Sequence, residues 1–594
     1  MNKKKWISAL LAGAIIMGLA GCAQVRPTEE VPSTETSSEI NTETEISYEV
    51  NTDTDIHIRD KNLLYENQDN TEIVTMYLTV STGNSAEGTD HTWEEINTYS
   101  AYDYEEMGVA RYKVAGLLQV GDENGPVAGE LGYNQLSSNC TVQIRGQSSS
   151  KGAQKNYKIK LKDNKGDWRG QTTIALNKHQ AEGLRFRNKM AFDMLSDIDE
   201  LMSLRTTFVH LYVRDTTSGS NAMFEDYGIY TQVEQLNKTA LSRHGLDKNG
   251  HLYKVNYCEF FRYEDSIVLK DDPNYDLNKF EQILEVKGDD DHSKLIDLLE
   301  KINDYSIPIE TILEEHLDIE NITYWMAFNI LVGNIDTQSR NFYLYSPQNS
   351  DRWYIYPWDI DAMLRRTEYE ILGRMDHEEW ESGVSNYWGN VLFQRCLKSE
   401  YFREELDLAM QDLFSRFDEA YINSYVDTYA ALLKPYVYSG KDLIYAPLTE
   451  EEYDIVAKNL ASEIADNYQR YQQSLQKPMP FYIGVPQKTA KGYTVQWDAA
   501  FDFDREDITY TFALSQDYTF QTTLYQNDTL TIPTVDFQKL PEGQYFMRVT
   551  ATNTSGYTQT AFDYYRAEND KIYGTKCFYI DEKGNVVEDL YAED

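Results

Sequence analysis

The alternation of apolar and polar residues predicts strands in the first half of the chain. The segment IVTMYLTV (73–80) is rich in β-branched and aromatic residues. In CTVQIRG (140–146), polar side chains separate Val142 from Ile144. In NYKIKLK (156–162), the apolar residues fall on one face and the lysines on the other. This period of two indicates sheet strands that each bury one face.

After about residue 291 the apolar residues follow the period of a helix. The segment IENITYWMAFNILVG (319–333) and residues 402–475 are predicted to be helical. An earlier helix is predicted over RNKMAFDMLSDI (187–198). The chain thus joins a β-rich part to a helix-rich part near Glu234, which is an α+β organisation.

Beyond the prolines of KPMP (477–480), short segments of period two return and predict an antiparallel β-sandwich over 480–567. The segment LPEGQYFMRVTATNTSGYT (540–558) resembles the last strands of a fibronectin type III domain. In that resemblance Trp497 matches the core tryptophan and Tyr545 the corner tyrosine. Such modules are usually spacers or binding surfaces.

Both ends of the chain have distinct compositions. Residues 1–21 combine three early lysines with an uncharged apolar run, and the sequence Leu-Ala-Gly-Cys that ends at Cys22 resembles a lipobox. We predict a lipoprotein signal peptide and lipidation of Cys22, which would anchor the protein on the extracytoplasmic face of a bacterial membrane through lipid only; the alternative is an ordinary signal peptide. Residues 22–70 are acidic and poor in apolar side chains, which predicts a disordered tether. Residues 568–594 are predicted to be an acidic tail or a small hairpin.

The charge of the chain narrows the choice of partners. The net charge is −42, and removal of the three signal lysines makes it −45 (−42 minus 3). Such a chain would repel the phosphates of nucleic acid, whereas cationic partners or metal ions could bind to it. The alternative is that most of the charge only keeps the protein soluble. The four cysteines after Cys22 are widely spaced without a C-x-x-C pair, so no zinc site is indicated and disulfide pairing stays open.

A polar loop after the predicted helix 319–333 carries the candidate chemistry. Asp336 and Asn341 are separated by four residues, as are the base and the metal-binding amide in the catalytic loop of protein kinases. The apolar runs FYLY and WYIY predict a hairpin after the loop, and Asp359 follows it. Mg²⁺ is usually held by one or two protein oxygen ligands, so Asn341 and Asp359 would suffice. On spacing alone, Asp and Asn in loops more often only form turns.

Seven separated blocks extend this interpretation. They are RGQSSSKGAQKNYKIKL, NKMAFDML, SLRTTFVHLYV, GIYTQVEQ, HLYKVNY, NILVGNIDTQSRNFYLY and WYIYPWDID. In this order they resemble the CotH family of atypical secreted protein kinases, over about residues 71–475. The resemblance implies a divergent, two-lobed, kinase-like fold. It also implies ATP with Mg²⁺ or Mn²⁺, and phosphoryl transfer to Ser or Thr of an exported or cell-envelope protein.

The resemblance gives roles to individual residues. It implies that Asp336 is the catalytic base, that Asn341 and Asp359 bind the metal, and that Asp361 is a weaker metal candidate. The chain departs from ordinary kinases, because it has no G-x-G-x-x-G loop, no His-Arg before the catalytic Asp and no Asp-Phe-Gly.

A second group of residues is assigned to the nucleotide. Small residues in RGQSSSKG would let backbone N–H groups approach phosphates, although the segment also fits a tight turn. The lysines would anchor phosphates, but at least one of those at 158, 160 and 162 is expected to belong to a solvated basic face. The glutamate near the junction of the two parts would bind adenine or pair locally. These candidates are Arg145, Gly146, Ser148, Ser149, Lys155, Lys160 and Glu234.

Two classes of function remain open from the sequence. One is an ATP-dependent protein kinase at the cell surface, where ATP is scarce. The other is a catalytically silent lipoprotein that uses the same fold and the β-sandwich to bind a protein or a polysaccharide. A metal-dependent hydrolase ranks last, because the nine histidines are scattered and form no H-E-x-x-H.

Overall fold

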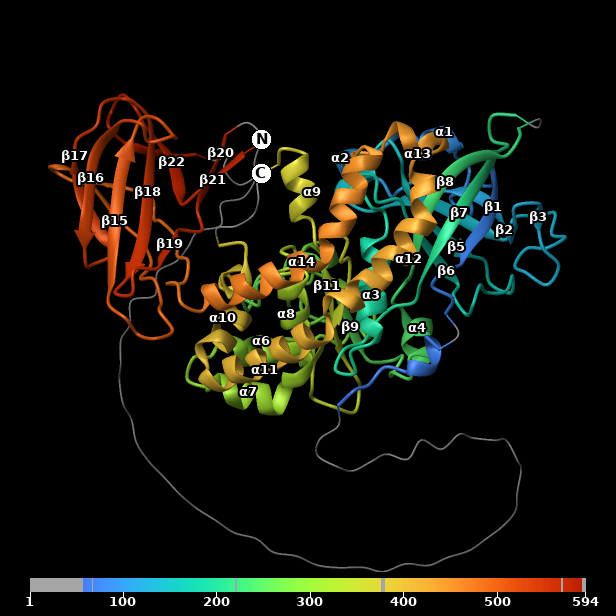
Figure 1. The fold of residues 1–594 in the computed structure, drawn as a ribbon, viewed down its shortest axis with the longest axis horizontal. Helices are drawn as coiled ribbons and strands as arrows, with labels where there is room; N and C mark the ends of the chain where they lie inside the picture. Colours follow the sequence, from blue (N-terminus) through green and yellow to red (C-terminus); the bar gives the residue numbers. More distant parts are fainter. Residues whose placement is uncertain (1–56, 67, 220–221, 375–379, 568–569, 590–594) are drawn as a thin grey trace, which may run out of the picture. The chain divides into compact units, whose positions relative to one another are not determined.

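A computed structural model describes residues 57–66, 68–219, 222–374, 380–567 and 570–589. They belong to one unit that begins at His57 and combines helices with sheets, as Figure 1 shows, and this confirms the α+β class predicted from the sequence. The predicted signal peptide, Cys22 and most of the predicted tether lie outside the described residues. No helix in the described part of the chain is long and apolar enough to cross a membrane.

The first half folds into one eight-stranded sheet in the order β1-β7-β8-β6-β5-β4-β2-β3. β1 also pairs with β2, so seven of the strands close into a ring around a core of Val, Ile, Leu and Tyr side chains. Helices α1 and α2 (Trp93–Thr98, Ala101–Met107) pack on this core. The strand bounds are β1 Ile73–Ser81, β2 Val114–Asp122, β3 Gly125–Pro126, β4 Cys140–Arg145, β5 Asn156–Leu161, β6 Thr173–Asn177, β7 Thr206–Asp215 and β8 Glu225–Glu234.

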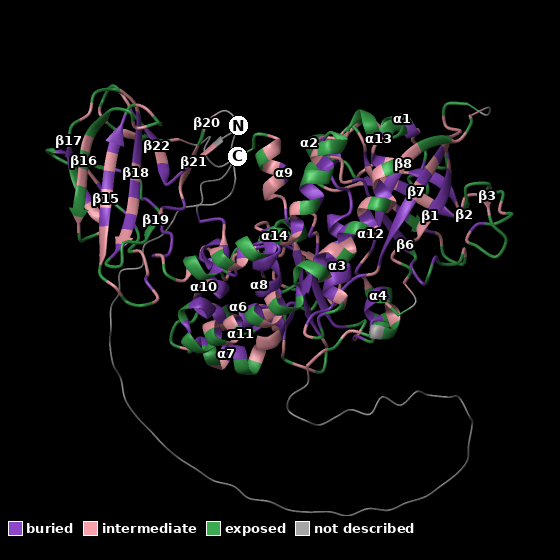
Figure 2. Ribbon diagram, in the orientation of Figure 1, coloured by how far each residue is buried: buried purple, intermediate pink, exposed green. Residues whose placement is uncertain are grey.

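The second half surrounds helix α8 (Ile319–Leu331), which is buried almost all round, as its purple ribbon in Figure 2 shows. Beside it lies a four-stranded sheet in the order β10-β9-β11-β12. The predicted helices are confirmed, but the strands β9 and β10 were not expected here. The bounds are α3 Arg187–Ser196, α4 Lys238–Arg243, β9 His251–Val255, α5 Leu277–Glu281, β10 Leu284–Val286, α6 Ser293–Asn303, α7 Ile309–His316, β11 Phe342–Ser346, β12 Tyr354–Pro357, α9 Arg366–Ile371, η3 Gly383–Tyr387, α10 Val391–Lys398, α11 Glu400–Arg416, α12 Glu419–Val437, α13 Gly440–Ile444 and α14 Glu450–Ser474.

The C-terminal residues form the predicted β-sandwich, with sheets β13-β14-β17 and β16-β15-β18-β22-β23. Trp497 is buried in its core, and the Tyr545 hydroxyl donates to the Pro541 carbonyl at 2.9 Å. The predicted end of the sandwich at residue 567 was wrong, because β22 pairs with β18 and carries β23 as a hairpin. The bounds are β13 Gln487–Lys488, β14 Gly492–Gln496, β15 Ile508–Ser515, β16 Thr523–Leu530, β17 Thr534–Gln538, β18 Gly543–Asn553, β19 Thr558–Thr560, β20 Tyr564–Ala567, β21 Asp570–Tyr573, β22 Thr575–Ile580 and β23 Val586–Glu588.

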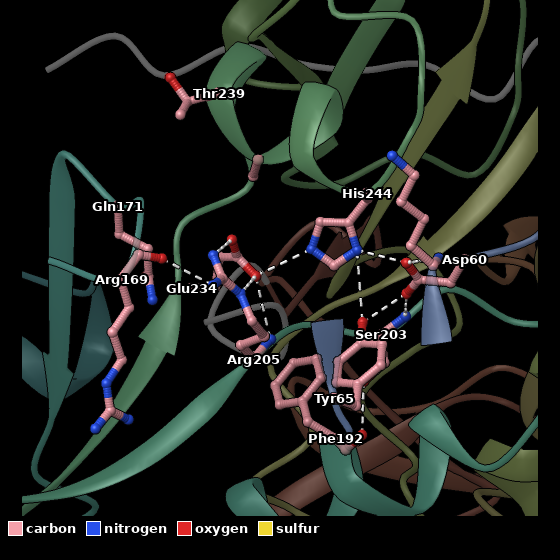
Figure 3. A network of polar contacts seen from close by, with 12 residues as sticks. Asp60, Tyr65, Arg169, Gln171, Phe192, Ser203, Arg205, Glu234, Thr239 and His244 are labelled. Carbon is pink, nitrogen blue, oxygen red and sulfur yellow. Dashed lines mark hydrogen bonds and ion pairs between the residues drawn. The ribbon is translucent and has the colours of Figure 1, made fainter. Parts of the chain in front are cut away.

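The last part of the predicted tether packs against the domain, so its boundary at residue 71 is corrected to His57. The Asp60 carboxylate lies 2.6 Å from the Nδ1 atom of His244, and it accepts hydrogen bonds from the Tyr65 hydroxyl and the Ser203 amide, as Figure 3 shows. A composition poor in apolar residues concealed this segment, because polar and ionic contacts hold much of it in place.

We expect Asp60→Ala to destabilise the protein by about 3 kcal/mol, because it leaves a buried imidazolium with one carboxylate fewer. The pKa of His244 is raised to about 9: burial opposes the rise, but Asp60 and Glu234 outweigh it. This stabilisation is therefore complete below the ordinary histidine pKa of about 6.5 and is lost as the pH rises through about 9. Thermal unfolding between pH 6 and pH 10 tests this, with the exposed Asp69→Ala as control. A variant as stable as the parent at pH 6 would contradict it.

Candidate functional site

Two loops at one end of the β11–β12 hairpin bring the acidic candidates together. Phe342 pairs with Pro357 at this end of the hairpin. Asn341 directly precedes β11, and Asp359 follows β12 by two residues. The hairpin predicted from FYLY and WYIY is therefore confirmed, and its register explains why residues 18 positions apart (359 minus 341) meet at the same edge.

Asp336 lies in the loop that connects α8 to this hairpin, and 47% of its side chain is exposed. Its carboxylate accepts a hydrogen bond from the Nδ2 atom of Asn341 at 3.2 Å and lies 3.2 Å from the Nε atom of Arg340. The pKa of Asp336 is raised, first by partial withdrawal from water and also by the charge of Asp361. The site thus presents a carboxylate of increased basicity to an open face.

Asp359 and Asp361 have opposite electrostatic environments. Burial and the neighbouring Asp361 raise the pKa of Asp359 to about 6. Burial also acts to raise the pKa of Asp361, but His179 outweighs it and the pKa is lowered. The Nδ1 atom of His179 lies 3.1 Å from Asp361. Among the described residues, the Asp359 side chain has no hydrogen bond or ion pair, so it is the carboxylate available to a cation.

The backbone is strained at both candidate metal ligands. Asn341 has φ 63° and Asp359 has φ 54°, which is the left-handed region that side chains other than glycine rarely occupy. Each such residue costs on the order of 1 kcal/mol or more, and strain of this kind often accompanies functional constraint. His179, the partner of Asp361, is also left-handed, with φ 49°.

Basic side chains lie near these carboxylates or near one another on the neighbouring strands. Arg145 at the end of β4 is close enough to Asp359 and Asp361 for their charges to act on its pKa. The charges of Asp359 and Arg145 likewise act on the pKa of Lys254 on β9. Lys158 on β5 also lies near Arg145. Desolvation lowers the pKa of all three side chains. We call Arg145, Lys158 and Lys254 the basic cluster.

The basic cluster contains two residues that were not selected from the sequence. Among the described residues, the side chains of Lys158 and Lys254 have no hydrogen bond or ion pair. Partly desolvated cations without partners are costly unless an anion binds them. The alternation of NYKIKLK already placed Lys158 and Lys160 on one face of the strand. The β4–β5 register then puts this face on the same side of the sheet as Arg145. Lys254 had no such signal, because β9 was not recognised as a neighbour of β11.

The other nucleotide candidates lie elsewhere in the first half. Lys155 is buried and donates to the carbonyl of Ser150 at 2.6 Å, so it holds the β4–β5 connection in place. Lys160 is exposed on β5. Gly146, with φ 87°, leads into a 3₁₀ turn over Ser148–Lys151, which matches the tight-turn alternative. A Cβ on Gly146 would lie 2.1 Å from the Oγ atom of Ser149, so only glycine fits this turn.

Glu234 belongs to the network of Figure 3. Its carboxylate binds the guanidinium of Arg205 and lies 3.0 Å from the Nε2 atom of His244. Burial acts to raise its pKa, but these hydrogen bonds outweigh it and lower the pKa to about 2. The structure favours the local-pairing alternative, and we do not retain this side chain as an adenine ligand.

The donor set fits a metal that also takes ligands from phosphates. Within the described residues, no group of three His, Cys, Asp or Glu side chains is placed to hold a metal ion. The unpaired carboxylate of Asp359 and the amide oxygen of Asn341, which has no hydrogen bond among the described residues, offer two hard oxygens. Mg²⁺ and Mn²⁺ accept such oxygens, and Mg²⁺ commonly binds through few protein ligands and substrate phosphates.

Comparisons with known proteins identify the family of this chain. A family model described as CotH kinase protein matches residues 142–471, which is more than half of the 594 residues. The chain is also 24% identical over 300 residues to the inner spore coat protein H of Bacillus subtilis (strain 168), covering 49% of this chain and 77% of that protein. The matched region contains the polar loop, the hairpin and the basic cluster. The chain belongs to the CotH family.

Proposed function

We propose that this protein is an ATP-dependent Ser/Thr protein kinase. The observation that carries the proposal is the meeting of three groups at one end of the β11–β12 hairpin. These are the loop carboxylate of Asp336, whose pKa is raised, the unpaired carboxylate of Asp359 and the basic cluster, in which Lys158 and Lys254 have no hydrogen bond or ion pair among the described residues. A base, a metal ligand and phosphate ligands are the parts that phosphoryl transfer requires. The β-rich and helix-rich halves on either side correspond, in this proposal, to the two lobes of a kinase-like fold.

Each residue has a distinct role in the proposed reaction. Asp336 accepts the proton of a Ser or Thr hydroxyl. The oxygen of that hydroxyl forms the bond to the γ-phosphorus of ATP, and ADP leaves. Arg145, Lys158 and Lys254 bind the nucleotide phosphates. Asn341 and Asp359 would hold Mg²⁺ or Mn²⁺, which supplies positive charge to the phosphate oxygens. Asp361 is held by His179 and acts through its charge on Asp359.

The proposed location follows from the N-terminal sequence and the relative. A lipid on Cys22 would hold the domain at the outer face of a bacterial membrane, where an exported or cell-envelope protein is the proposed acceptor. The Bacillus subtilis relative is named as a protein of the inner spore coat. The β-sandwich resembles a fibronectin type III module.

Lys158 and Lys160 provide a matched test of the phosphate site. They lie two residues apart on β5. Lys158 is only partly exposed and lies near Arg145, whereas Lys160 is exposed. We expect Lys158→Met to weaken ATP binding by about tenfold, since the loss of one charge-assisted contact costs about 1.5 kcal/mol. Lys160→Met is expected to bind ATP like the parent. Equal affinities of the two variants would contradict the phosphate role of Lys158.

The function itself is tested by transfer of a labelled γ-phosphoryl group. The mature chain would be incubated with γ-labelled ATP, with Mg²⁺ or Mn²⁺, and with an array of Ser and Thr peptides. We expect metal-dependent label on peptides or on the chain itself. Nucleotide binding without any transfer would instead support a catalytically silent binding protein.

A further inference from the structure

The loop that connects α8 to β11 (residues 332–341) carries Asp336, and we call it the catalytic loop. Its backbone is held by a segment that follows α9. We call residues 380–390 the loop brace. The Nδ2 atom of Asn386 donates to the Ile335 carbonyl at 3.0 Å, and the Nδ2 atom of Asn390 donates to the Gln338 carbonyl at 2.8 Å. A third contact joins the hydroxyls of Tyr387 and Thr337 at 2.9 Å. These three contacts bind the loop on both sides of Asp336, the proposed base.

The loop brace is held in turn by the C-terminal module. The carboxylate of Glu381 accepts hydrogen bonds from the Nζ atom of Lys571 and from the Tyr573 hydroxyl, both at 2.6 Å. Trp380 packs edge-on against Phe562, with ring centroids 5.1 Å apart. Glu381 and Trp380 are each only 6% exposed. Removal of the charged partner of a buried carboxylate strongly destabilises the folded protein, so the hydrogen bonds from Lys571 and Tyr573 to Glu381 are energetically important.

Glu381, which the module holds, lies near the loop that carries Asp336. Glu381 lines the same cavity as Gly333, Asn334 and Ile335, which immediately precede Asp336. The negative charge of Glu381 also contributes to the raised pKa of Asp336. The contacts therefore form a continuous chain from the strand β21, through Glu381 and the loop brace, to the catalytic loop.

We propose that the C-terminal module positions the catalytic loop through its two-stranded β20–β21 sheet, and that Lys571 and Tyr573 on β21 are positioning residues. They hold Glu381, the loop brace fixes the backbone around residues 335–338, and Asp336 is thereby kept in place for the acceptor hydroxyl. The catalytic consequence rests on the proposed kinase function, whereas the structural coupling does not. The module would then be part of the active enzyme instead of a spacer.

The coupling predicts a local effect of Lys571→Met on the full mature chain. We expect amide hydrogen exchange to become faster in residues 333–341 and to remain unchanged in α8. We also expect kcat to fall about tenfold with little change in the KM for ATP, since the loss of one positioning contact is worth about 1.4 kcal/mol. Lys571→Arg should restore both properties. Lys488→Met is the control, because that lysine binds residues of the module itself.

Each outcome bears on one of the two proposals. If Lys571→Met exchanges like the parent at residues 333–341, the coupling is refuted. If the parent transfers no phosphoryl group but the variant still exchanges faster at the loop, the coupling stands and the kinase function fails. If Lys571→Met does not fold, Tyr573→Phe removes a single hydroxyl, and the same exchange measurement decides.

Discussion

Asp336→Asn is expected to reduce phosphoryl transfer by a factor on the order of 10² or more while nucleotide and metal binding stay intact. The amide keeps the shape of the carboxylate and its place beside Arg340, but it has no basic lone pair for the hydroxyl proton. The measurement pairs the initial rate of transfer with calorimetric titration of ATP and Mn²⁺.

The control for this prediction is Asp351→Asn. Asp351 is an exposed residue of the turn at the opposite end of the β11–β12 hairpin. It should transfer phosphate like the parent. The raised pKa of Asp336 also predicts that activity falls with decreasing pH as its carboxylate is protonated. A rate for Asp336→Asn equal to that of the parent would refute the assignment of the base.

Asp359→Ala is expected to abolish turnover and to weaken metal-dependent ATP binding by at least about tenfold, because the metal loses its carboxylate ligand. Because the pKa of Asp359 is about 6, the metal affinity of the parent should also depend on pH. A metal must displace the proton below that pH, so the metal affinity should fall by about tenfold per pH unit below 6. Affinity that is independent of pH between 5 and 7 would contradict the role of Asp359.

The same carboxylate predicts a cost to stability. The folded pKa of Asp359 is above its ordinary value, so the folded state binds more protons between about pH 4 and pH 6. Its contribution to stability therefore decreases as the pH rises through that window. Without metal, Asp359→Asn should unfold at a higher temperature than the parent at pH 7.5, and this advantage should disappear at pH 4. Such a trade of stability for function is common at active sites.

The carboxylates of the site could be predicted from the sequence because they lie close together along the chain. Asp336 and Asn341 lie in one loop, and the two apolar runs FYLY and WYIY are enough to predict the hairpin that brings Asp359 back to the same end. The basic half depends on the tertiary structure. Lys254 comes from β9, whose pairing with β11 joins residues about 90 positions apart (343 minus 254 for one pair). No local pattern specifies such a contact.

Errors at the domain boundaries have a similar physical origin. Composition marked residues 57–70 as tether, but Asp60 is bound by an ion pair and hydrogen bonds that composition does not register. Strand β22 (Thr575–Ile580) was assigned to an acidic tail or a small separate hairpin. It does form a hairpin with β23, but it also pairs with β18 and so belongs to the sandwich. For Glu234 the sequence left adenine binding and local pairing both open, because its partners Arg205 and His244 meet it only in the fold.

Calorimetric titration of the mature protein with ATP, in the presence and absence of Mn²⁺, tests the central claim most directly, since it requires no knowledge of the protein acceptor. The proposed site predicts binding of one ATP per chain that depends on the metal, with weaker binding by Asp359→Ala and Lys158→Met and unchanged binding by Lys160→Met. ATP binding that is absent, or that is the same with and without Mn²⁺ and in all three variants, would contradict it.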